Sequence, residues 1–309
     1  MNRRLGAMAV AAVLVALAAW APVTLARFTV AKSAAGAFTT ATLVPPTSVS
    51  GNGGATVASL AWTPSTSSGA AGYHLLRSAT SGSGYAQIKA VTPLSAAATT
   101  DAPGSGTWYY VLDTSFGAWT SGHSNEATLV VGPRSTSLKD CTLNAAETTG
   151  SGDNNGYETN PASGCIRDGL YATDANSGTN TGVSCTSTRK DRHRFWGYTV
   201  GLPGTVTSVN GILVQLVAGL NAYTGTNNIC VQLSWDSGTT WTTAKQVTLT
   251  SAALTAYQLG GIADTWGHTG WTPAQLGAST LRVRITDVSS VATRSFYLDQ
   301  VAVAVNYTP

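Results

Sequence analysis

The chain has 309 residues, 10% of them charged, and its formal net charge at pH 7 is +3. This length exceeds that of a typical single domain and leaves room for two globular units after an export segment. A charge so close to neutral does not require a nucleic-acid partner, and we expect none. Gly, Ser, Thr and Ala are abundant and helical periodicity is missing after residue 30, which favours short strands joined by turns.

The N-terminus has the pattern of an export signal. Two arginines precede an uncharged, largely apolar run from Leu5 to Ala26. Small residues at Thr24 and Ala26 favour cleavage there, so we expect a signal peptide over residues 1–26 and a secreted or cell-surface protein. The alternative is an uncleaved anchor, because an apolar helix of this length would span roughly 33 Å of bilayer. Only then would the chain contact a membrane.

Residues 27–43 form a leader to the first domain. Two Phe-Thr pairs, at Phe28 and Phe38, are followed by Leu43. This pattern resembles the exported matrix-fibre and camelysin-like proteins, and the resemblance implies a matrix or filament subunit. A plain polar leader is the alternative. Because the leader is rich in Thr, Val and Phe, we expect that it could add as an extra strand to the open sheet edge of a neighbouring subunit.

Strand and turn signals over residues 44–132 predict a first β-sandwich. Turn clusters recur about every 8–12 residues, as in sandwich folds. One strand ends at Trp62-Thr63-Pro64, and another begins at Thr107-Trp108-Tyr109-Tyr110. The segment resembles a bacterial fibronectin type III domain along its whole length. The resemblance implies that Trp62 is the core tryptophan of the second strand and that Tyr109 forms the tyrosine corner.

Residues 135–309 predict a second β-sandwich after the Gly132-Pro133 boundary. Apolar residues alternate along several segments, as in Ile212, Val214 and Leu216, which indicates strands with one face in a core. The proline at the boundary cannot donate to a strand ladder and so ends the first domain.

The order of motifs in this second segment carries a further resemblance. Asp168-Gly169-Leu170-Tyr171, Val209-Asn210-Gly211-Ile212 and Tyr297-Leu298-Asp299 occur in the order found in a jelly-roll-like module of bacterial surface and phage-associated proteins. The expected fold class is therefore all-β, with a fibronectin type III-like sandwich followed by a jelly-roll-like β-sandwich. Such a fold does not by itself assign a function.

All four cysteines lie in the second half of the chain, without the close paired spacing of a zinc site. In an exported protein they predict two disulfides. Cys141 and Cys165 flank one Gly- and Asn-rich excursion, so sequence proximity favours their pairing. Cys230 is out of phase with its apolar neighbours, and we expect it to reach Cys185 across the outer surface of the sheet.

The segment Ser234-Trp235-Asp236-Ser237-Gly238-Thr239-Thr240-Trp241 resembles the Asp-box of sialidase-type propellers and other β proteins. We expect a structural turn in which Asp236 accepts backbone N–H bonds, Gly238 supplies a positive φ and Trp241 packs on the hairpin. A single copy argues against a propeller.

A Gly-rich loop places four polar and aromatic residues close together in sequence: Asp264, Trp266, His268 and Trp271. Two indole rings beside a carboxylate suit sugar rings, through stacking and hydrogen bonds, so this loop is the candidate glycan-binding site. The alternative is that both tryptophans anchor a long loop onto the sandwich.

A basic run before Phe195 predicts a second candidate surface. In a strand, Lys190, Arg192 and Arg194 would share one face within about 14 Å, where they could meet an anionic partner. The alternative is a solvated strand edge that discourages aggregation.

No cofactor is expected, although a structural calcium ion has candidate ligands in Asp153, Glu158 and Asp299. The spaced ligand set of an EF-hand is missing, and the alternative is a plain solvated turn and a strand-edge carboxylate.

Catalytic motifs are missing. The four histidines are scattered, and neither Gly-x-Ser-x-Gly nor His-Glu-x-x-His occurs. A carboxylate pair such as Asp236 with Asp264 is the remaining candidate for glycosidase chemistry. We therefore expect a non-enzymatic, exported structural or adhesion protein whose partners are copies of itself or other surface components. The alternative function is glycan binding through the loop tryptophans.

Overall fold

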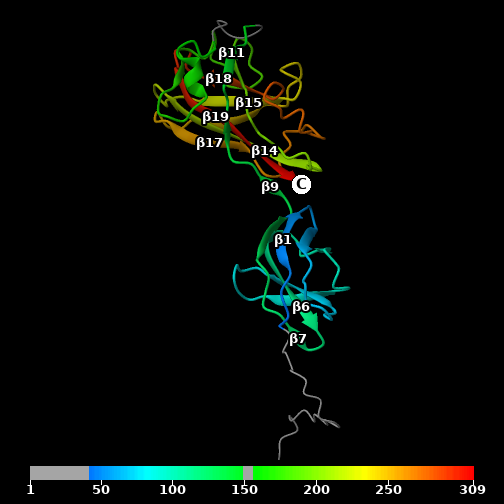
Figure 1. Ribbon diagram of the computed structural model, residues 1–309. Coiled ribbons are helices and arrows are strands. Elements are labelled where there is room, and N and C mark those ends of the chain that lie inside the picture. Colours follow the sequence, from blue (N-terminus) through cyan, green and yellow to red (C-terminus); the bar gives the residue numbers. More distant parts are fainter. Residues whose placement is uncertain (1–41, 149–155) are drawn as a thin grey trace, which may run out of the picture. The chain divides into compact units, whose positions relative to one another are not determined.

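The computed structural model describes residues 42–148 and 156–309, which fold as two β-sandwiches (Figure 1). The signal segment, most of the leader and Asp153 lie outside these ranges. Within the described residues the one helix is a 3₁₀ turn, η1 (Pro161–Gly164), and no helix is long and apolar enough to cross a membrane. The all-β fold class expected from the sequence is confirmed.

The first sandwich consists of two antiparallel sheets. Its smaller sheet has the order β1 (Thr47–Gly53), β2 (Ala58–Thr63) and β5 (Ala98–Asp101). The larger sheet has the order β4 (Ala86–Val91), β3 (Gly72–Ser78), β6 (Gly106–Phe116) and β7 (Trp119–Thr120), and β8 (Ala127–Val131) also pairs with β6. Sheets that pack in this arrangement make the first sandwich fibronectin type III-like.

The core of the first sandwich forms because its strands alternate. Along β2, Ala58, Leu60 and Trp62 are buried while the residues between them are exposed. Trp62 meets the ring of Tyr73 edge-on, with 5.5 Å between the ring centres. Such a geometry is favoured between aromatic rings. Trp62 is thus a core residue of the second strand, where the sequence placed it.

The expected tyrosine corner at Tyr109 is corrected by the structure. Tyr110 is fully buried, and its hydroxyl donates to Asp101 Oδ2 at 2.9 Å, whereas Tyr109 is only half-buried. Two consecutive tyrosines on a strand point to opposite faces, so only one of them can face the core. The phase of β6, set by its pairing with β3 and β8, selects Tyr110.

The second sandwich also has two antiparallel sheets. The first has the order β10 (Lys139–Asp140), β19 (Phe296–Thr308), β14 (Ser208–Leu220) and β17 (Thr255–Gly260), with β9 (Arg134–Ser135) and β12 (Ala172–Asp174) also paired to β19. The second has the order β11 (Leu143–Ala146), β13 (Arg192–Trp196), β18 (Arg282–Ser289), β15 (Asn227–Ser234) and β16 (Lys245–Thr248).

The inner faces of these two sheets form a single core. Ile212, Val214 and Leu216 of β14 are fully buried, and so are Val283 and Ile285 of β18. Because strand side chains alternate, the residues between them face outward. That alternation places Arg282 and Arg284 of β18 on the outer surface of the five-stranded sheet, where the candidate site lies.

Two disulfides join Cys141 to Cys165 and Cys185 to Cys230, which is the pairing expected from the sequence. None of the four cysteines is free. The first bridge fastens the segment after β10 to the residue that follows η1, and the second fastens a long loop to β15. Both therefore hold excursions that few apolar residues hold in place.

Candidate functional site: an arginine and tryptophan face

Four arginines lie on the outer face of the five-stranded sheet. Strand β13 contributes Arg192 and Arg194, and the neighbouring β18 contributes Arg282 and Arg284. The register pairs Arg194 directly with Arg284. His193, between the two β13 arginines, is buried, and so is Phe195 after them, so alternation directs the guanidinium groups to one surface. We call this surface the arginine face.

In the part of the chain that the structure describes, Glu147 is the carboxylate that pairs with these cations. Glu147, just after β11, has Oε1 2.9 Å from Arg284 Nη1 and 3.9 Å from Arg192 Nη1. Its Oε2 lies 4.0 Å from Arg194 Nε. A single glutamate cannot neutralise four guanidinium groups, which stay protonated in proteins. The arginine face therefore carries an excess of positive charge.

Two tryptophans stack against the arginines. Arg282 Cζ lies 4.7 Å from the centre of the Trp196 ring, and Arg284 Cζ lies 4.1 Å from that of Trp241. Arg284 also donates through Nε and Nη2 to Gln232 Oε1, at 3.1 and 2.7 Å. Stacking leaves the in-plane N–H donors of a guanidinium available, while cation–π attraction holds its plane in place. The arginine face is thus preorganised.

Burial affects the pKa values of Arg282 and Arg284. It lowers the pKa of the Arg282 guanidinium, and repulsion from Arg194 lowers it further. Burial also lowers the pKa of Arg284, while the adjacent Glu147 opposes that shift. Both pKa values fall because the positive form is crowded by like charge and partly removed from water. An added anion would relieve this crowding.

The Asp-box hairpin borders the arginine face. Asp236 Oδ1 accepts N–H bonds from Thr239 at 3.1 Å and Thr240 at 2.8 Å, and Gly238 has a φ of +96°. Desolvation opposes the effect, but the bonds from Thr240 and its neighbours hold the pKa of Asp236 below its usual value. The turn carries Trp241 onto Arg284 of β18, a contact that the sequence analysis did not predict.

Lys190 is not part of the arginine face, contrary to the sequence-based expectation. Its side chain is fully buried, and Nζ donates to the carbonyl oxygen of Asn180. Strand β13 begins only at Arg192, so the alternation does not extend back to position 190. Burial lowers the pKa of Lys190, while the charges of Asp191, Asp174 and Asp287 oppose that shift.

The predicted tryptophan platform for glycans is corrected too. Trp266 and Trp271 are 2% and 4% exposed. Their indole N–H groups donate to the carbonyl oxygens of Ile212 at 2.8 Å and Thr265 at 2.9 Å. Rings buried on a core cannot stack on a sugar, so both anchor the loop, as the alternative interpretation held.

The other two residues of that loop support the anchor. Asp264 Oδ2 lies 2.9 Å from Lys245 Nζ, and its Oδ1 accepts the N–H of Trp266 at 2.8 Å. Desolvation opposes the effect, but Lys245 holds the pKa of Asp264 below its usual value. His268 stacks on Trp235 with 3.8 Å between ring centres.

Two of the three candidate calcium ligands are used by backbone amides. Glu158 Oε1 accepts the N–H of Ala175 at 2.7 Å, and Asp299 Oδ1 accepts those of Asp168 and Gly169, each at 3.1 Å. Asp153 lies outside the described residues. Within residues 42–148 and 156–309, no group of three or more His, Cys, Asp or Glu side chains is arranged to hold a metal ion.

Sequence reasoning missed most of the arginine face. It recognised Arg192 and Arg194 but did not join them to Arg282 and Arg284, or to Glu147. The signal available was the alternation of charged and apolar residues in both segments. Which strands are neighbours is a long-range property that this alternation does not contain.

Comparisons with known proteins gave matches to solved structures alone. No protein-family model matches the chain, and the search of curated proteins found no match. An Fn3-like protein from Clostridium thermocellum is 25% identical, with 29% of this chain and 95% of that chain covered and a TM-score of 0.26. The K3 cleaved adhesin domain of Lys-gingipain from Porphyromonas gingivalis is 14% identical, with 55% and 99% covered and a TM-score of 0.31. The CBM22-1 xylan-binding domain of Paenibacillus barcinonensis Xyn10C is 13% identical, with 54% and 95% covered and a TM-score of 0.22.

Proposed function

We propose that this chain is an exported, non-enzymatic adhesion protein whose second sandwich binds acidic polysaccharide at the cell surface or in the extracellular matrix. One observation carries the proposal: two adjacent strands present four arginines on one face, and Glu147 is the one carboxylate paired with them among the residues that the structure describes. Arginine forks match the geometry of carboxylate and sulfate groups. A positively charged surface also raises the local concentration of an anionic polymer.

The spacing of the cations favours a polymer over a single small anion. Arg192 and Arg194 are separated by roughly 7 Å along β13, and the next strand lies about 4.8 Å away. Their side chains are 24% and 33% exposed, whereas that of Arg284 is 12% exposed. The first two therefore serve as contact residues, and Arg284 with Trp241 serves as the scaffold that fixes them.

Export is supported by the cysteines. All four are in disulfides, which persist in oxidising compartments outside the cytosol. The basic and apolar N-terminus is consistent with that location. A structural role as a matrix or filament subunit belongs to the same proposal. Because the leader lies mostly outside the described residues, the support for assembly comes from the second sandwich.

The contacts of the histidines support a non-enzymatic role. His193 is buried, and burial together with Arg194 lowers its pKa to about 4. His74 Nδ1 lies 3.0 Å from Asp113, and His268 stacks on Trp235. A general base needs access to substrate and a pKa near the working pH. These three side chains are engaged in packing and pairing instead.

The carboxylate pair considered for glycosidase chemistry, Asp236 and Asp264, has pKa values shifted in the wrong direction for a general acid. A general acid needs a raised pKa. The pKa values of Asp236 and Asp264 are both lowered, the first by backbone hydrogen bonds and the second by Lys245. Neither carboxyl group is therefore suited to give a proton to a leaving group.

The test is binding of the purified mature protein to a sulfated polysaccharide and to a polyuronate, with neutral dextran as the uncharged comparison. We expect retention that weakens steeply with salt, because screening acts on exposed charges. Replacing Arg192 and Arg194 by alanine should reduce affinity at least tenfold. The charge-matched control replaces Lys89 of β4 and Lys139 of β10, neither of which belongs to the arginine face, and should change affinity less than twofold.

Two results would contradict the proposal. Equal losses in both double variants would mean that net charge alone sets binding. Retention on dextran that does not change with salt concentration would indicate that the ligand is a neutral glycan and that it binds at a different surface. Hydrolysis of either polymer that disappears with one carboxylate substitution would overturn the non-enzymatic part separately.

A further inference from the structure

A loop with exposed apolar residues projects from the second sandwich between η1 and β12. In this loop, residues 166–171, the exposed fractions of Leu170, Ile166 and Tyr171 are 65%, 58% and 39%. We call it the tip loop. Contiguous exposed apolar side chains mark interaction surfaces more often than single ones do.

The tip loop is held in a fixed shape. Asp299, 3% exposed, accepts the backbone N–H groups of Asp168 and Gly169, and Asp168 Oδ1 accepts that of Leu170 at 2.9 Å. Gly169 has a φ of +85°, and the disulfide at Cys165 holds the base of the loop. A loop ordered in advance loses little conformational entropy when it binds.

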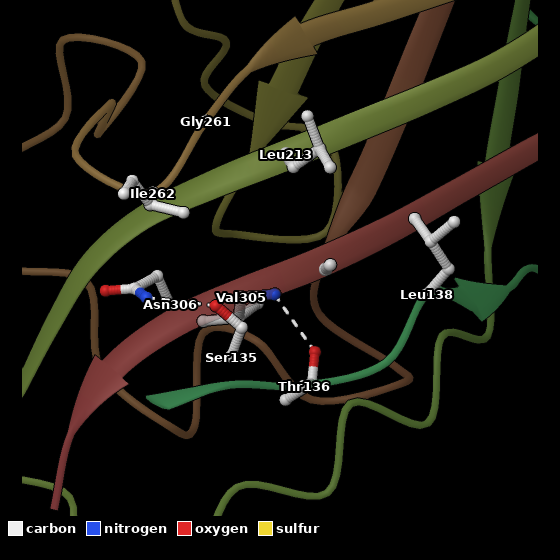
Figure 2. A pocket seen from close by; sticks show the side chains of 9 residues that line it. Ser135, Thr136, Leu138, Leu213, Gly261, Ile262, Val305 and Asn306 are labelled. Atoms are coloured by element: carbon white, nitrogen blue, oxygen red, sulfur yellow. Dashed lines mark hydrogen bonds between the residues drawn. The ribbon is translucent and has the colours of Figure 1, made fainter. Parts of the chain in front are cut away.

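An apolar groove lies at the other end of the same sheet (Figure 2). Its volume is about 230 Å³, and its apolar lining includes Leu213 of β14, Ala304 of β19, Leu138 and Ile262. Ile262 is 72% exposed and Leu138 is 38% exposed. The groove is smaller than the roughly 300–1,000 Å³ of small-molecule sites, so its size suits one or two side chains.

The polar groups at the groove are already paired. Thr136 Oγ1 accepts the N–H of Val305 at 3.0 Å, drawn dashed in Figure 2, and Asn306 Nδ2 donates to Ser135 Oγ at 3.0 Å. Among residues 42–148 and 156–309, no charged side chain lines the groove. Aliphatic side chains fit such a lining, whereas a charged ligand would find no partner there.

The tip loop and the groove are separate patches joined by β19. The ring of Tyr171 packs on that of Tyr297 at the start of the strand, with 4.5 Å between ring centres. Ala304 lies seven residues farther along β19, which corresponds to roughly 23 Å of strand. Two different patches that fit each other make a heterologous contact, and such contacts extend into open chains or close into rings.

We propose that the tip loop of one copy inserts Leu170 and Ile166 into the groove of a second copy, so that the protein assembles head to tail. Net charge does not oppose this contact, because loss of Arg3 and Arg4 leaves 15 basic residues (17 minus 2) against 14 acidic ones. The inference goes beyond polysaccharide binding and uses the opposite sheet from the arginine face.

The small contact area determines what kind of assembly forms. A few partly exposed aliphatic side chains bury far less than the roughly 800 Å² per partner of a stable interface. Each contact is therefore weak and reversible. Chains form at high protein concentration, such as that on a crowded surface, and dilute solutions contain monomers.

The test is sedimentation velocity of the full mature chain from micromolar to millimolar concentration. The wild type should sediment progressively faster as concentration rises, without a plateau at the dimer. Leu170→Asp and Ile262→Asp should each abolish that rise. The control Tyr223→Asp changes a residue that is 63% exposed in the same sandwich and outside both patches, and it should leave the rise unchanged.

A complementation experiment separates a direct contact from general loss of apolar surface. Leu170→Asp and Ile262→Lys chains should each be monomeric alone, and their mixture should form dimers, because the intact tip loop of the Ile262→Lys chain can enter the intact groove of the Leu170→Asp chain. All variants change exposed side chains, so unchanged thermal unfolding is required of each. A monomeric wild type, a plateau at the dimer, or association that persists in Leu170→Asp would overturn the proposal, and none of these outcomes affects the polysaccharide assay.

Discussion

Arg284 Cζ lies 4.1 Å from the centre of the Trp241 ring. Arg284 belongs to an alternating strand, and Trp241 ends the Asp-box hairpin, about forty residues earlier in sequence. The contact therefore joins two local patterns into one surface. The turn of the hairpin thus places the Trp241 indole against the Arg284 guanidinium.

Replacing Arg284 by lysine should lower the free energy of unfolding by about 1–2 kcal/mol. Lysine has no planar fork, so it cannot reach Glu147 and Gln232 while stacking on Trp241. Urea denaturation measures the change. The control is Arg192→Lys, whose Nη1 lies 3.9 Å from Glu147 Oε1, and it should cost less than about 0.5 kcal/mol. Equal losses would contradict the scaffold role.

Tyr110→Phe should destabilise the first sandwich by about 1–2 kcal/mol, because it leaves a partly buried carboxylate oxygen of Asp101 with one donor fewer. Arg77 Nη1 remains on the same oxygen at 2.7 Å and limits the loss. Tyr109→Phe is the matched control and should have little effect, since that ring is half-buried. Thermal unfolding of both variants distinguishes the two. A larger loss in Tyr109→Phe would restore the tyrosine corner at that position.

Stability should fall as pH rises from about 4 to 7 because of a buried carboxyl cluster. Burial raises the pKa of Asp287 to about 7, with Tyr157, Asp174 and Lys190 opposing the shift and Glu158 adding to it. A carboxyl group whose pKa is raised in the folded state contributes stability below its unfolded pKa, and that contribution is lost as it ionises through the folded pKa. The loss is on the order of 3 kcal/mol.

Asp287→Asn should therefore flatten the dependence of unfolding free energy on pH between 4 and 7. The control Asp236→Asn should lower the free energy of unfolding at neutral pH and leave it unchanged in acid. The pKa of Asp236 is lowered in the folded state, so its contribution is present at neutral pH and disappears in acid. Guanidinium titrations at several pH values measure both variants. If Asp287→Asn shifted the whole curve of unfolding free energy against pH without changing its slope, the raised pKa of Asp287 would be contradicted.

Trp266→Ala should cost about 3–5 kcal/mol of stability, because it empties a buried site and removes the hydrogen bond to Ile212. Polysaccharide retention per folded molecule should not change. Trp119→Ala, at a ring that is 69% exposed, is the comparison and should alter stability by less than about 0.5 kcal/mol. Loss of retention with unchanged stability in Trp266→Ala would return the glycan site to this loop.

Some features of this protein were determined by the sequence itself. Alternation, turn residues and proline positions are local properties of the backbone, so the strands, the two cores and the structural role of Asp236 could be predicted. The pairing of Cys141 with Cys165 followed from proximity in the chain. Each of these predictions depends on residues that are neighbours in sequence.

Only the tertiary structure decided which side chains meet. Lys190 is buried near the charges of the adjacent Asp191 and of Asp174 and Asp287, which come from other strands, so its charge never reaches the arginine face. In the sequence, Trp266 was a candidate for sugar stacking. In the structure its indole N–H donates to the carbonyl oxygen of Ile212 in β14. The register of β13 with β18 assembled the four arginines. Burial and strand pairing depend on partners far apart in the chain, and local periodicity holds no information about them.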